Sequence, residues 1–182
     1  MTTVSDLDYV RAHVRQVPDF PKKGILFLDI TTAVKDAEAM QKMINFLYEE
    51  FENKKVDYVA GIESRGFIFG AALANKLGVG FIPIRKPNKL PAETIKESYS
   101  LEYGTDTIEM HTDAVKKGDR VVVIDDLLAT GGTANAACNL VKKAGGDVVA
   151  AAFIIELDPL KGREKIEANG VDVVSMLHYD LD

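Results

Sequence analysis

The chain has 182 residues, of which 47% are apolar, enough for one compact domain with a full core and too many for an intrinsically disordered protein. Its 22 Lys and Arg residues against 28 Asp and Glu residues give a formal charge of −6, opposite in sign to a nucleic-acid-binding surface. The single cysteine, Cys138, excludes an internal disulfide, and we expect it to be a small buried side chain.

No segment resembles a membrane span or a signal peptide. The longest uninterrupted apolar run, at residues 148–155, is much shorter than the roughly 20 residues that a spanning helix needs. The first ten residues, MTTVSDLDYV, lack a basic region followed by an apolar one. We therefore expect a cytoplasmic protein with no membrane partner and no nucleic-acid partner.

Hydrophobic periodicity predicts the elements in chain order. Leu7, Val10 and Val14 recur at helical spacing, and a second helix carries a stripe from Met40 to Phe51 that we expect to face the core. Strands are then predicted at residues 57–62, 79–84, 120–124, 148–155 and 171–177, and helices at residues 66–77, 133–144 and 162–168. The strands are apolar throughout, as in a parallel sheet with helices on both faces. We predict a single doubly wound α/β domain over residues 1–182.

One connection is too long for this fold. Residues 85–118 contain β-like fragments at 99–101 and 107–111, and long excursions of this kind are often functional. In open α/β sheets, ligands bind outside the carboxyl ends of the strands. We therefore look for chemistry at residues 63–66, 85–91 and 125–133, all of which are polar or rich in glycine.

Two adjacent carboxylates follow the predicted strand at residues 120–124. Asp125 and Asp126 lie in the stretch VVVIDDLLATGGTA, residues 121–134. Two like charges beside a buried strand end are unfavourable unless a cation or hydroxyl groups compensate them. A ribose diol or a hydrated divalent cation would do so.

A glycine-containing loop comes directly after these acids and runs into a helix. Its two glycines let backbone N–H groups turn toward an anion, the threonines add hydroxyls, and the helix N-terminus adds a favourable dipole; the loop comprises Ala129, Thr130, Gly131, Gly132 and Thr133. Sugar hydroxyls and a phosphate would then lie one short loop apart, as in a 5-phosphorylated ribose. The alternative is a plain turn between strand and helix with an acidic cap.

Five further segments, in order, carry a family resemblance: PDFPKKGILFLDIT at 18–31, GIESRGFIFG at 61–70, IRKPNKLP at 84–91, SYSLEYG at 98–104 and LKGREK at 160–165. With ATGGT at 129–133, the sequence resembles the phosphoribosyltransferase family, and in particular its adenine-specific members. The resemblance implies that a homodimer converts adenine and 5-phosphoribosyl 1-pyrophosphate (PRPP) to AMP and pyrophosphate with Mg²⁺.

The resemblance also implies roles for the charged residues. Asp125 and Asp126 would hold the ribose hydroxyls, Asp126 also reaching Mg²⁺ through water, and residues 129–133 would hold the 5-phosphate. Arg65 would act in catalysis and bind pyrophosphate, together with Arg85, Lys86 and Lys89. The alternatives are a surface ion pair of Arg65 with its neighbour Glu63, and a solvated basic loop at residues 85–89.

A lid and a base site complete the implied arrangement. Residues 85–110 would form a flexible β-hairpin lid, in which Glu102 manages the purine proton and Tyr103 shields the sugar from water. The alternative for these two residues is an ordinary hairpin. Residues 1–34 would form a hood, with adenine near Leu26 and Phe27. Leu28 stands where some relatives carry an arginine, which leaves base recognition to backbone groups.

Two rival functions remain to be compared. Transfer to guanine, hypoxanthine or xanthine usually goes with an acidic residue where Ala129 stands. A regulator that only binds the sugar phosphate resembles a fusion to a DNA-binding domain, and the roughly twenty residues before Gly24 are too few for a winged helix. The three histidines lack metal-ligand spacing, and we expect none to be catalytic: His13, His111 and His178.

Overall fold

The structure is a computed structural model that describes residues 1–100 and 104–180. Its centre is a five-stranded sheet in the order β4-β3-β7-β8-β9, in which every neighbouring pair is parallel. The strands of this sheet are β3 (Tyr58–Ile62), β4 (Gly80–Ile84), β7 (Arg120–Leu128), β8 (Asp147–Leu157) and β9 (Val173–Tyr179). The predicted parallel α/β sheet is confirmed.

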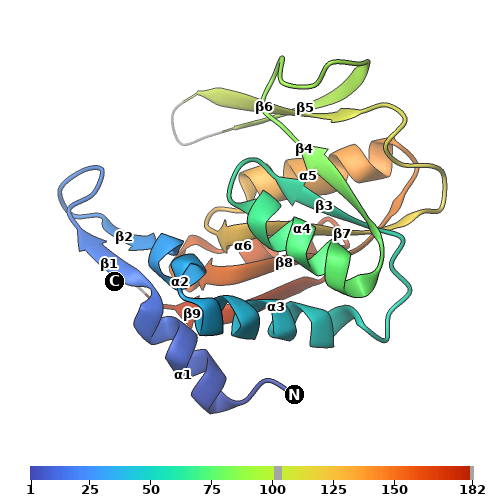
Figure 1. Cartoon of the computed structure of the whole chain (residues 1–182). Coiled ribbons are helices and arrows are strands. Elements are labelled where there is room, and N and C mark those ends of the chain that lie inside the picture. The colour runs from blue at the N-terminus through green and yellow to red at the C-terminus, as the bar shows by residue number, and fades with distance from the viewer. Residues whose placement is uncertain (101–103, 181–182) are drawn as a thin grey trace.

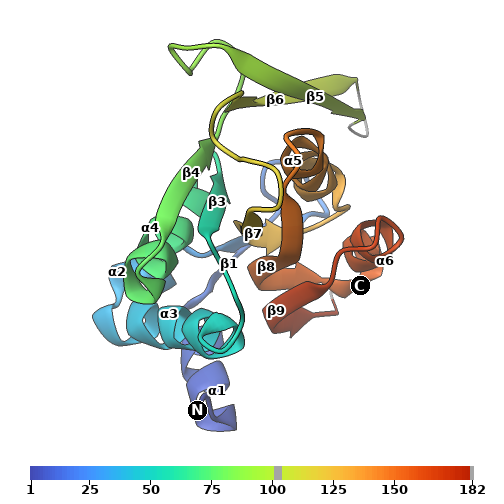
Figure 2. The ribbon, with the colours of Figure 1, turned by 90° about the vertical axis from the view of Figure 1, so that its right-hand side faces the viewer.

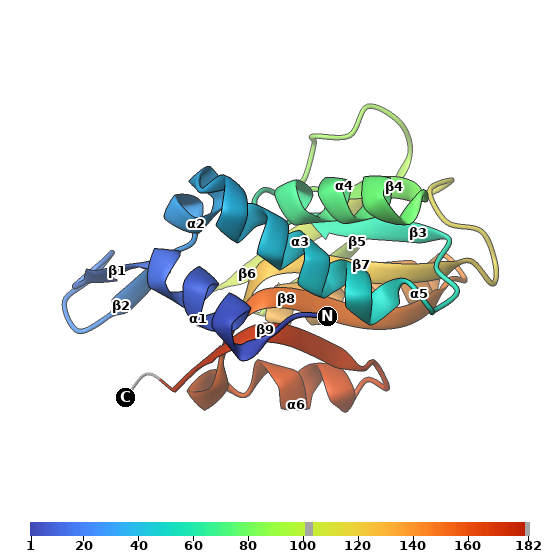
Figure 3. The same ribbon diagram turned by 60° about the horizontal axis from the view of Figure 1, so that its bottom comes forward.

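Helices cover both faces of this sheet, which gives the molecule three layers (Figure 2). One layer holds α1 (Val4–His13), α2 (Thr31–Lys35), α3 (Ala37–Phe51) and α4 (Gly66–Leu77). The other layer holds α5 (Gly132–Lys143) and α6 (Gly162–Glu167), and a 3₁₀ turn at Asp158–Leu160 precedes α6. Figure 3 shows α1 and α6 on opposite sides of the sheet. This is the doubly wound arrangement predicted from the apolar strands.

The core explains why the strands do not alternate between apolar and polar residues. In β7, Val122 and Ile124 pack with the α1 to α4 layer, whereas Val121 and Val123 pack with the α5 and α6 layer. All four are fully buried, because successive side chains of a strand point to opposite faces and here both faces are covered. Cys138 lies in the second of these cores, where burial raises its pKa to about 12 and keeps the thiol protonated at neutral pH.

The strands β7, β8 and β9 end beyond their predicted carboxyl ends. The strand predicted at residues 120–124 continues to Leu128, so the acidic pair lies inside β7 and does not follow it. The reason is pairing with β8, where Asp125 faces Phe153 and Leu127 faces Ile155. Strand β8 itself extends to Leu157 for the same reason. A strand thus tolerates two carboxylates when its neighbour continues to supply ladder hydrogen bonds.

Two hairpins lie outside the sheet (Figure 1). The antiparallel pair β1 (Arg15–Pro18) and β2 (Leu26–Asp29) has no counterpart among the predicted strands, because four-residue strands carry too little periodicity. The pair β5 (Thr94–Ser100) and β6 (Thr105–His111) contains both predicted β-like fragments except residue 101. Glu102 and Tyr103 lie outside the described residues.

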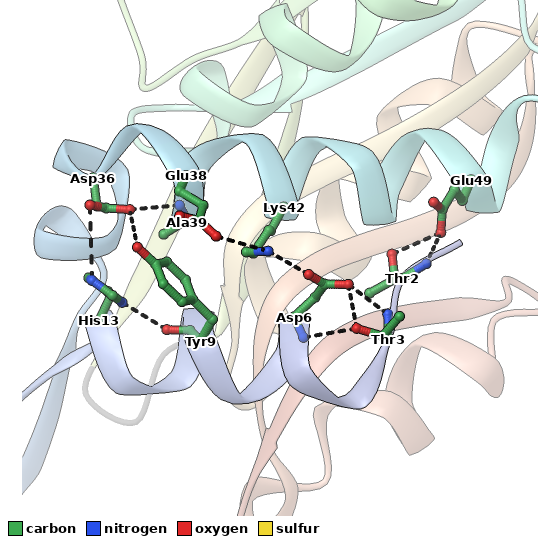
Figure 4. A network of polar contacts seen from close by, with 10 residues as sticks. All are labelled: Thr2, Thr3, Asp6, Tyr9, His13, Asp36, Glu38, Ala39, Lys42 and Glu49. Atoms are coloured by element: carbon green, nitrogen blue, oxygen red, sulfur yellow. Dashed lines mark hydrogen bonds and ion pairs between the residues drawn. The ribbon is translucent and has the colours of Figure 1, made fainter.

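A polar network joins α1 to α3 (Figure 4). Lys42 on α3 forms ion pairs with Asp6 and Glu38, and Thr3 caps α1 through a reciprocal pair of hydrogen bonds with Asp6. Further along α3, Glu49 accepts hydrogen bonds from the backbone and side chain of Thr2. The network fixes the N-terminal helix on its neighbour. In the described part of the chain, no helix has the length and apolar character to cross a membrane.

Candidate active site

The predicted site residues come from neighbouring strands at the carboxyl edge of the sheet. Register pairs Ile62 with Ile84, and Gly61 with Ile124, so β3, β4 and β7 bring their following residues to one level. Strand β3 lies between β4, which follows it in the chain, and β7, which comes later. This is the point where the strand order reverses, and it is where open α/β sheets bind ligands.

Arg65 and the acidic pair meet at this edge. The Arg65 Nε donates to Asp126 Oδ2, and Asp126 is only 5% exposed. Glu63, the alternative partner of Arg65, is instead held by Arg85, whose Nε lies 3.1 Å from Oε2 and whose Nη2 lies 3.2 Å from Oε1. Arg65 therefore pairs with Asp126 and not with Glu63, and its role in catalysis and pyrophosphate binding stays a prediction. The buried carboxylate of Asp126, on β7, is thus balanced by a guanidinium that follows the neighbouring strand β3.

Asp125 has a different environment from its neighbour. Burial and the adjacent carboxylate of Asp126 raise the pKa of Asp125 well above its ordinary value, and the Asp126 N–H donates to Asp125 Oδ1 at 2.9 Å. The first residue of α4, Gly66, packs closely here, since a Cβ atom at this position would lie 2.7 Å from the Ile124 carbonyl oxygen. The acidic pair thus combines one carboxylate paired with arginine and one whose pKa is raised by burial and by its neighbour.

The loop after the acids forms a small cavity. Gly131 has φ of 74°, the left-handed region that glycine adopts readily, and α5 begins at the next residue. The N-cap residue Gly131 provides no side-chain cap for this helix, and the first N–H groups of a helix can bind an anion. A cavity of about 90 Å³ is lined by Asp125 and by every predicted phosphate residue, Ala129, Thr130, Gly131, Gly132 and Thr133.

Helix α6 supports this loop from behind, a feature that sequence reasoning missed. A Cβ atom on Gly162 would lie 2.2 Å from the Ala129 carbonyl oxygen, and one on Gly131 would lie 2.6 Å from the Gly162 carbonyl oxygen. Both positions therefore need glycine for the two segments to pack. The match of LKGREK to the family was the available sign that this segment matters. Its role depends on the contact between Gly131 and Gly162, which are 31 positions apart in the sequence.

The predicted basic cluster lies at the end of β4, where its cations have partners. Glu63 accepts from both Arg85 and the backbone N–H of Lys86, the latter at 2.9 Å. The Lys86 ammonium pairs with Asp106 on β6, and Arg85 Nη1 donates to the Lys89 carbonyl oxygen at 3.3 Å. The structure thus brings Arg85 and Lys86 to the same edge as Arg65, and it connects Lys89 to them through its backbone.

A cavity of about 430 Å³ lies between the β1 and β2 hairpin and Arg65. Phe27 lines it, whereas Leu26 is outside the lining residues that the structure describes. Phe20, which sequence reasoning missed, meets the Phe27 ring edge-on at a centroid distance of 5.1 Å. Leu28 also contributes to the lining, but it is a buried member of the hydrophobic core and its side chain offers no hydrogen bond. The cavity can therefore hold a flat apolar ring, with orientation left to backbone groups.

The carboxylates at this edge fit a magnesium ion that arrives with a phosphorylated substrate. Asp126 is already paired with Arg65, so these two carboxylates do not form an all-protein cage for the ion. Mg²⁺ usually keeps several waters and binds through one or two carboxylates together with substrate phosphates. The donor set suits that mode, with Asp126 as the residue that would contact the hydrated ion.

One histidine lies closer to carboxylates than the sequence spacing indicates. His178 Nδ1 is 2.9 Å from Asp158 Oδ1 and 3.8 Å from Glu156 Oε2, at the carboxyl ends of β8 and β9. The Arg163 guanidinium donates two hydrogen bonds to the Glu156 carboxylate, at 2.9 and 2.6 Å. Because the guanidinium already balances that carboxylate, we assign this group to the packing of α6 and not to catalysis.

Comparison with known proteins agrees with this geometry. Residues 30–180 match the phosphoribosyl transferase domain, so the chain belongs to the phosphoribosyltransferase family. It is 57% identical over 173 residues to the adenine phosphoribosyltransferase of Koribacter versatilis, covering 95% of this chain and 94% of that protein. It is 48% identical to the adenine phosphoribosyltransferase of Vibrio cholerae, covering 98% of each. Within the larger family, the chain is thus a member of the adenine phosphoribosyltransferases.

Solved structures show the same relationship. The crystal structure of adenine phosphoribosyltransferase from Thermoanaerobacter pseudethanolicus has a TM-score of 0.91 and 51% identity, covering 95% of this chain and 99% of that one. The Saccharomyces cerevisiae enzyme, complexed with adenine and an imino-altritol bisphosphate, has a TM-score of 0.90 and 41% identity, covering 96% of this chain and 100% of that one. The doubly wound fold is therefore shared over nearly the whole chain.

Proposed function

We propose that this protein is a pentosyltransferase that moves the 5-phosphoribosyl group of PRPP to adenine, giving AMP and pyrophosphate for purine salvage. The observation that carries the proposal is the spacing at the end of β7. An acidic pair and a helix N-terminus lie one short loop apart, with the half-buried Asp125 and the buried Asp126 before the loop and Gly132 after it. Adenine phosphoribosyltransferases match the chain from end to end, which supports adenine as the acceptor.

The sugar phosphate would bind along this loop. The 5-phosphate takes the N–H groups and hydroxyls of residues 129–133, and the ribose hydroxyls contact Asp125 and Asp126. Asp126, paired with Arg65, accepts a hydrogen bond from one ribose hydroxyl, and Asp125 contacts the other. These complementary roles orient the sugar with its anomeric carbon toward the cavity beside Phe27.

The leaving pyrophosphate needs cations at the opposite end of the sugar. Arg65 reaches it from the start of α4, and Arg85, Lys86 and Lys89 reach it from the end of β4. Fixed positive charges stabilise the negative charge that develops on the departing group, which lowers the barrier. Asp126 would hold Mg²⁺ through water, and the ion would supply further neutralisation of the pyrophosphate charge.

Adenine would occupy the cavity of about 430 Å³ within the hood segment, residues 1–34. The Phe27 ring supplies a stacking face, and backbone groups near Leu26 and Phe27 read the exocyclic amine and a ring nitrogen. A 6-oxopurine reverses a donor and an acceptor, which costs about 1 to 3 kcal/mol for each buried group left unpaired. Specificity for adenine thus needs no side chain at Leu28.

The lid assignment extends this proposal. The hairpin at residues 85–110 would close over the sugar, Glu102 would handle the purine proton, and Tyr103 would exclude water from the cationic sugar that forms as pyrophosphate leaves. The protein would act as a homodimer in the cytoplasm, where charged PRPP is found. Gel filtration with light scattering tests the dimer, which predicts about twice the chain mass of 19.9 kDa.

The test is direct conversion. Purified protein is incubated with PRPP, Mg²⁺ and one free purine at a time, and the nucleotides are separated by chromatography. We expect AMP from adenine and little product from hypoxanthine, guanine or xanthine. Equal use of adenine and hypoxanthine would overturn the base assignment. PRPP binding without any nucleotide product would instead favour the regulator.

A further inference from the structure

The cations at the end of β4 differ in how firmly their carboxylates hold them. Glu63 accepts three hydrogen bonds, two from the Arg85 guanidinium and one from the backbone of Lys86. Both partners of this pair are largely covered, with side-chain exposures of 31% for Arg85 and 19% for Glu63. The pair therefore fixes Arg85 at this edge, among the proposed pyrophosphate ligands.

Lys86 is held differently. Among residues 1–100 and 104–180, its ammonium pairs with a single carboxylate, that of Asp106 on β6 of the hairpin, and the two side chains are 41% and 30% exposed. Tyr99, opposite on β5, donates from its hydroxyl to Asp106 Oδ2 at 3.1 Å. Lys86 Nζ lies 3.4 Å from the same hydroxyl and 5.9 Å from the centre of the ring. These three side chains tie the end of β4 to the hairpin.

The hairpin has a second, independent tether. Glu97 on β5 pairs with Lys143 and accepts from Asn139 Nδ2 at 3.0 Å, and both partners belong to α5. Near the end of β5, a Cβ atom on Gly132 would lie 3.4 Å from the Ser100 carbonyl oxygen. Release of Lys86 would therefore leave the hairpin attached to α5, with its end beside the phosphate loop.

We propose that Asp106 is a positioning residue that holds Lys86 on the lid hairpin in the free enzyme and yields it to the pyrophosphate group of PRPP. The inference rests on the proposed function, which places Lys86 among the pyrophosphate ligands. Lys86 then exchanges one anion for another, so no unpaired ammonium forms in either state. PRPP binding competes with the tether, and the loss of the tether frees one side of the hairpin as substrate enters.

The strength of the pair supports an exchange and not a permanent bond. The Asp106 carboxylate, although partial burial opposes it, raises the pKa of Lys86, and the Lys86 ammonium lowers the pKa of Asp106. Both groups therefore stay charged at neutral pH and attract each other. Half-exposed ion pairs of this kind contribute little net free energy. A polyanion such as pyrophosphate can replace a single carboxylate here.

The test compares variants in steady-state kinetics with the full-length protein. Asp106→Asn removes the competing charge, so we expect the KM for PRPP and the Ki for pyrophosphate to fall together, by about twofold to fivefold. The KM for adenine should not change. Asp106→Glu should restore the wild-type values. A merely structural role would not lower both constants, and an unchanged or raised KM for PRPP in Asp106→Asn would overturn the inference.

Two further variants separate this inference from the proposed function. Glu97→Gln weakens the other tether of the hairpin without touching Lys86, and the KM for PRPP should stay at the wild-type value. Lys86→Ala should raise that KM. If Lys86→Ala has no effect while the wild-type protein still makes AMP, the inference fails and the function stands. If the wild-type protein makes no AMP, the proposed function fails first.

Discussion

Ion pairs cross two regions of this molecule, the interface of α1 with α3 and the carboxyl edge of the sheet, and they serve different ends. Between the helices, Lys42 joins Asp6 and Glu38 in a network that is complete within the protein (Figure 4). At the carboxyl edge of the sheet, Arg65 pairs with Asp126 and also lines the cavity of about 430 Å³, and Lys86 pairs with Asp106 of the hairpin. The same chemistry fixes a helix in one region and prepares charges for a ligand in the other.

The largest expected effect on turnover comes from a variant at the carboxyl edge of the sheet that leaves the interface of α1 with α3 intact. Asp126→Asn removes the charge that holds Arg65 and orients the ribose, so turnover should fall by at least about 100-fold. The fold should persist, as measured by circular dichroism and thermal melting. Asp172→Asn, at an exposed carboxylate, is the matched control and should keep wild-type turnover. Near-normal turnover in Asp126→Asn would refute the role of this residue.

A second variant lies on α6, which packs against the loop at residues 129–133. Gly162→Ala places a methyl group against the Ala129 carbonyl oxygen and must displace the phosphate loop. We expect the KM for PRPP to rise roughly 10- to 100-fold, the size of effect that a misplacement of about 1 Å produces. Glu164→Ala on the same helix removes an exposed side chain and should leave the KM unchanged. Equal values for both variants would mean that α6 does not position the loop.

The base cavity should respond more weakly and to one substrate only. Phe27→Ala removes a stacking face, so the KM for adenine should rise about threefold to tenfold. The dissociation constant for PRPP, measured by calorimetry without adenine, should not change. A parallel loss of PRPP affinity would show that Phe27 supports the fold of the edge and is not a base contact.

The smallest effect lies in the helix network and concerns stability against pH. Lys42 and Thr3 lower the pKa of Asp6 below its ordinary value of 3.8, so the pairing stabilises the fold above about pH 4, and this contribution is lost as the pH falls. In Asp6→Asn, the melting temperature should be slightly lower at pH 7 and should fall less steeply between pH 5 and pH 3. Asp8→Asn, at an exposed position of the same helix, serves as the control. Turnover should be normal in both.

Much of the fold was predictable because its strands are buried on both faces. Continuous apolar runs such as residues 121–124 identify parallel strands covered by helices, and the residues from Asp125 to Thr133 predict a turn into a helix with an acidic pair before it. The β1 strand was not predictable, since four residues with a proline show no period. The true length of β7 was missed because two acids interrupt its apolar pattern.

Contacts between segments that are distant in the chain could not be predicted from the sequence. Nothing in residues 61–70 distinguishes Glu63 from Asp126 as the partner of Arg65, because that choice depends on the register of β3 with β7. The support of residue 129 by Gly162 needs α6 to return to the edge. The approach of His178 to Asp158 needs β9 to lie beside β8. Local patterns specify elements and short motifs, whereas pairing partners follow from topology.

The most direct measurement is a crystal structure of the protein with AMP. The account predicts the phosphate at the N–H groups of residues 130–133, the ribose hydroxyls within hydrogen-bond distance of Asp125 or Asp126, and adenine beside Phe27. A phosphate bound at Arg85 and Lys86, with residues 129–133 left without a ligand, would contradict it.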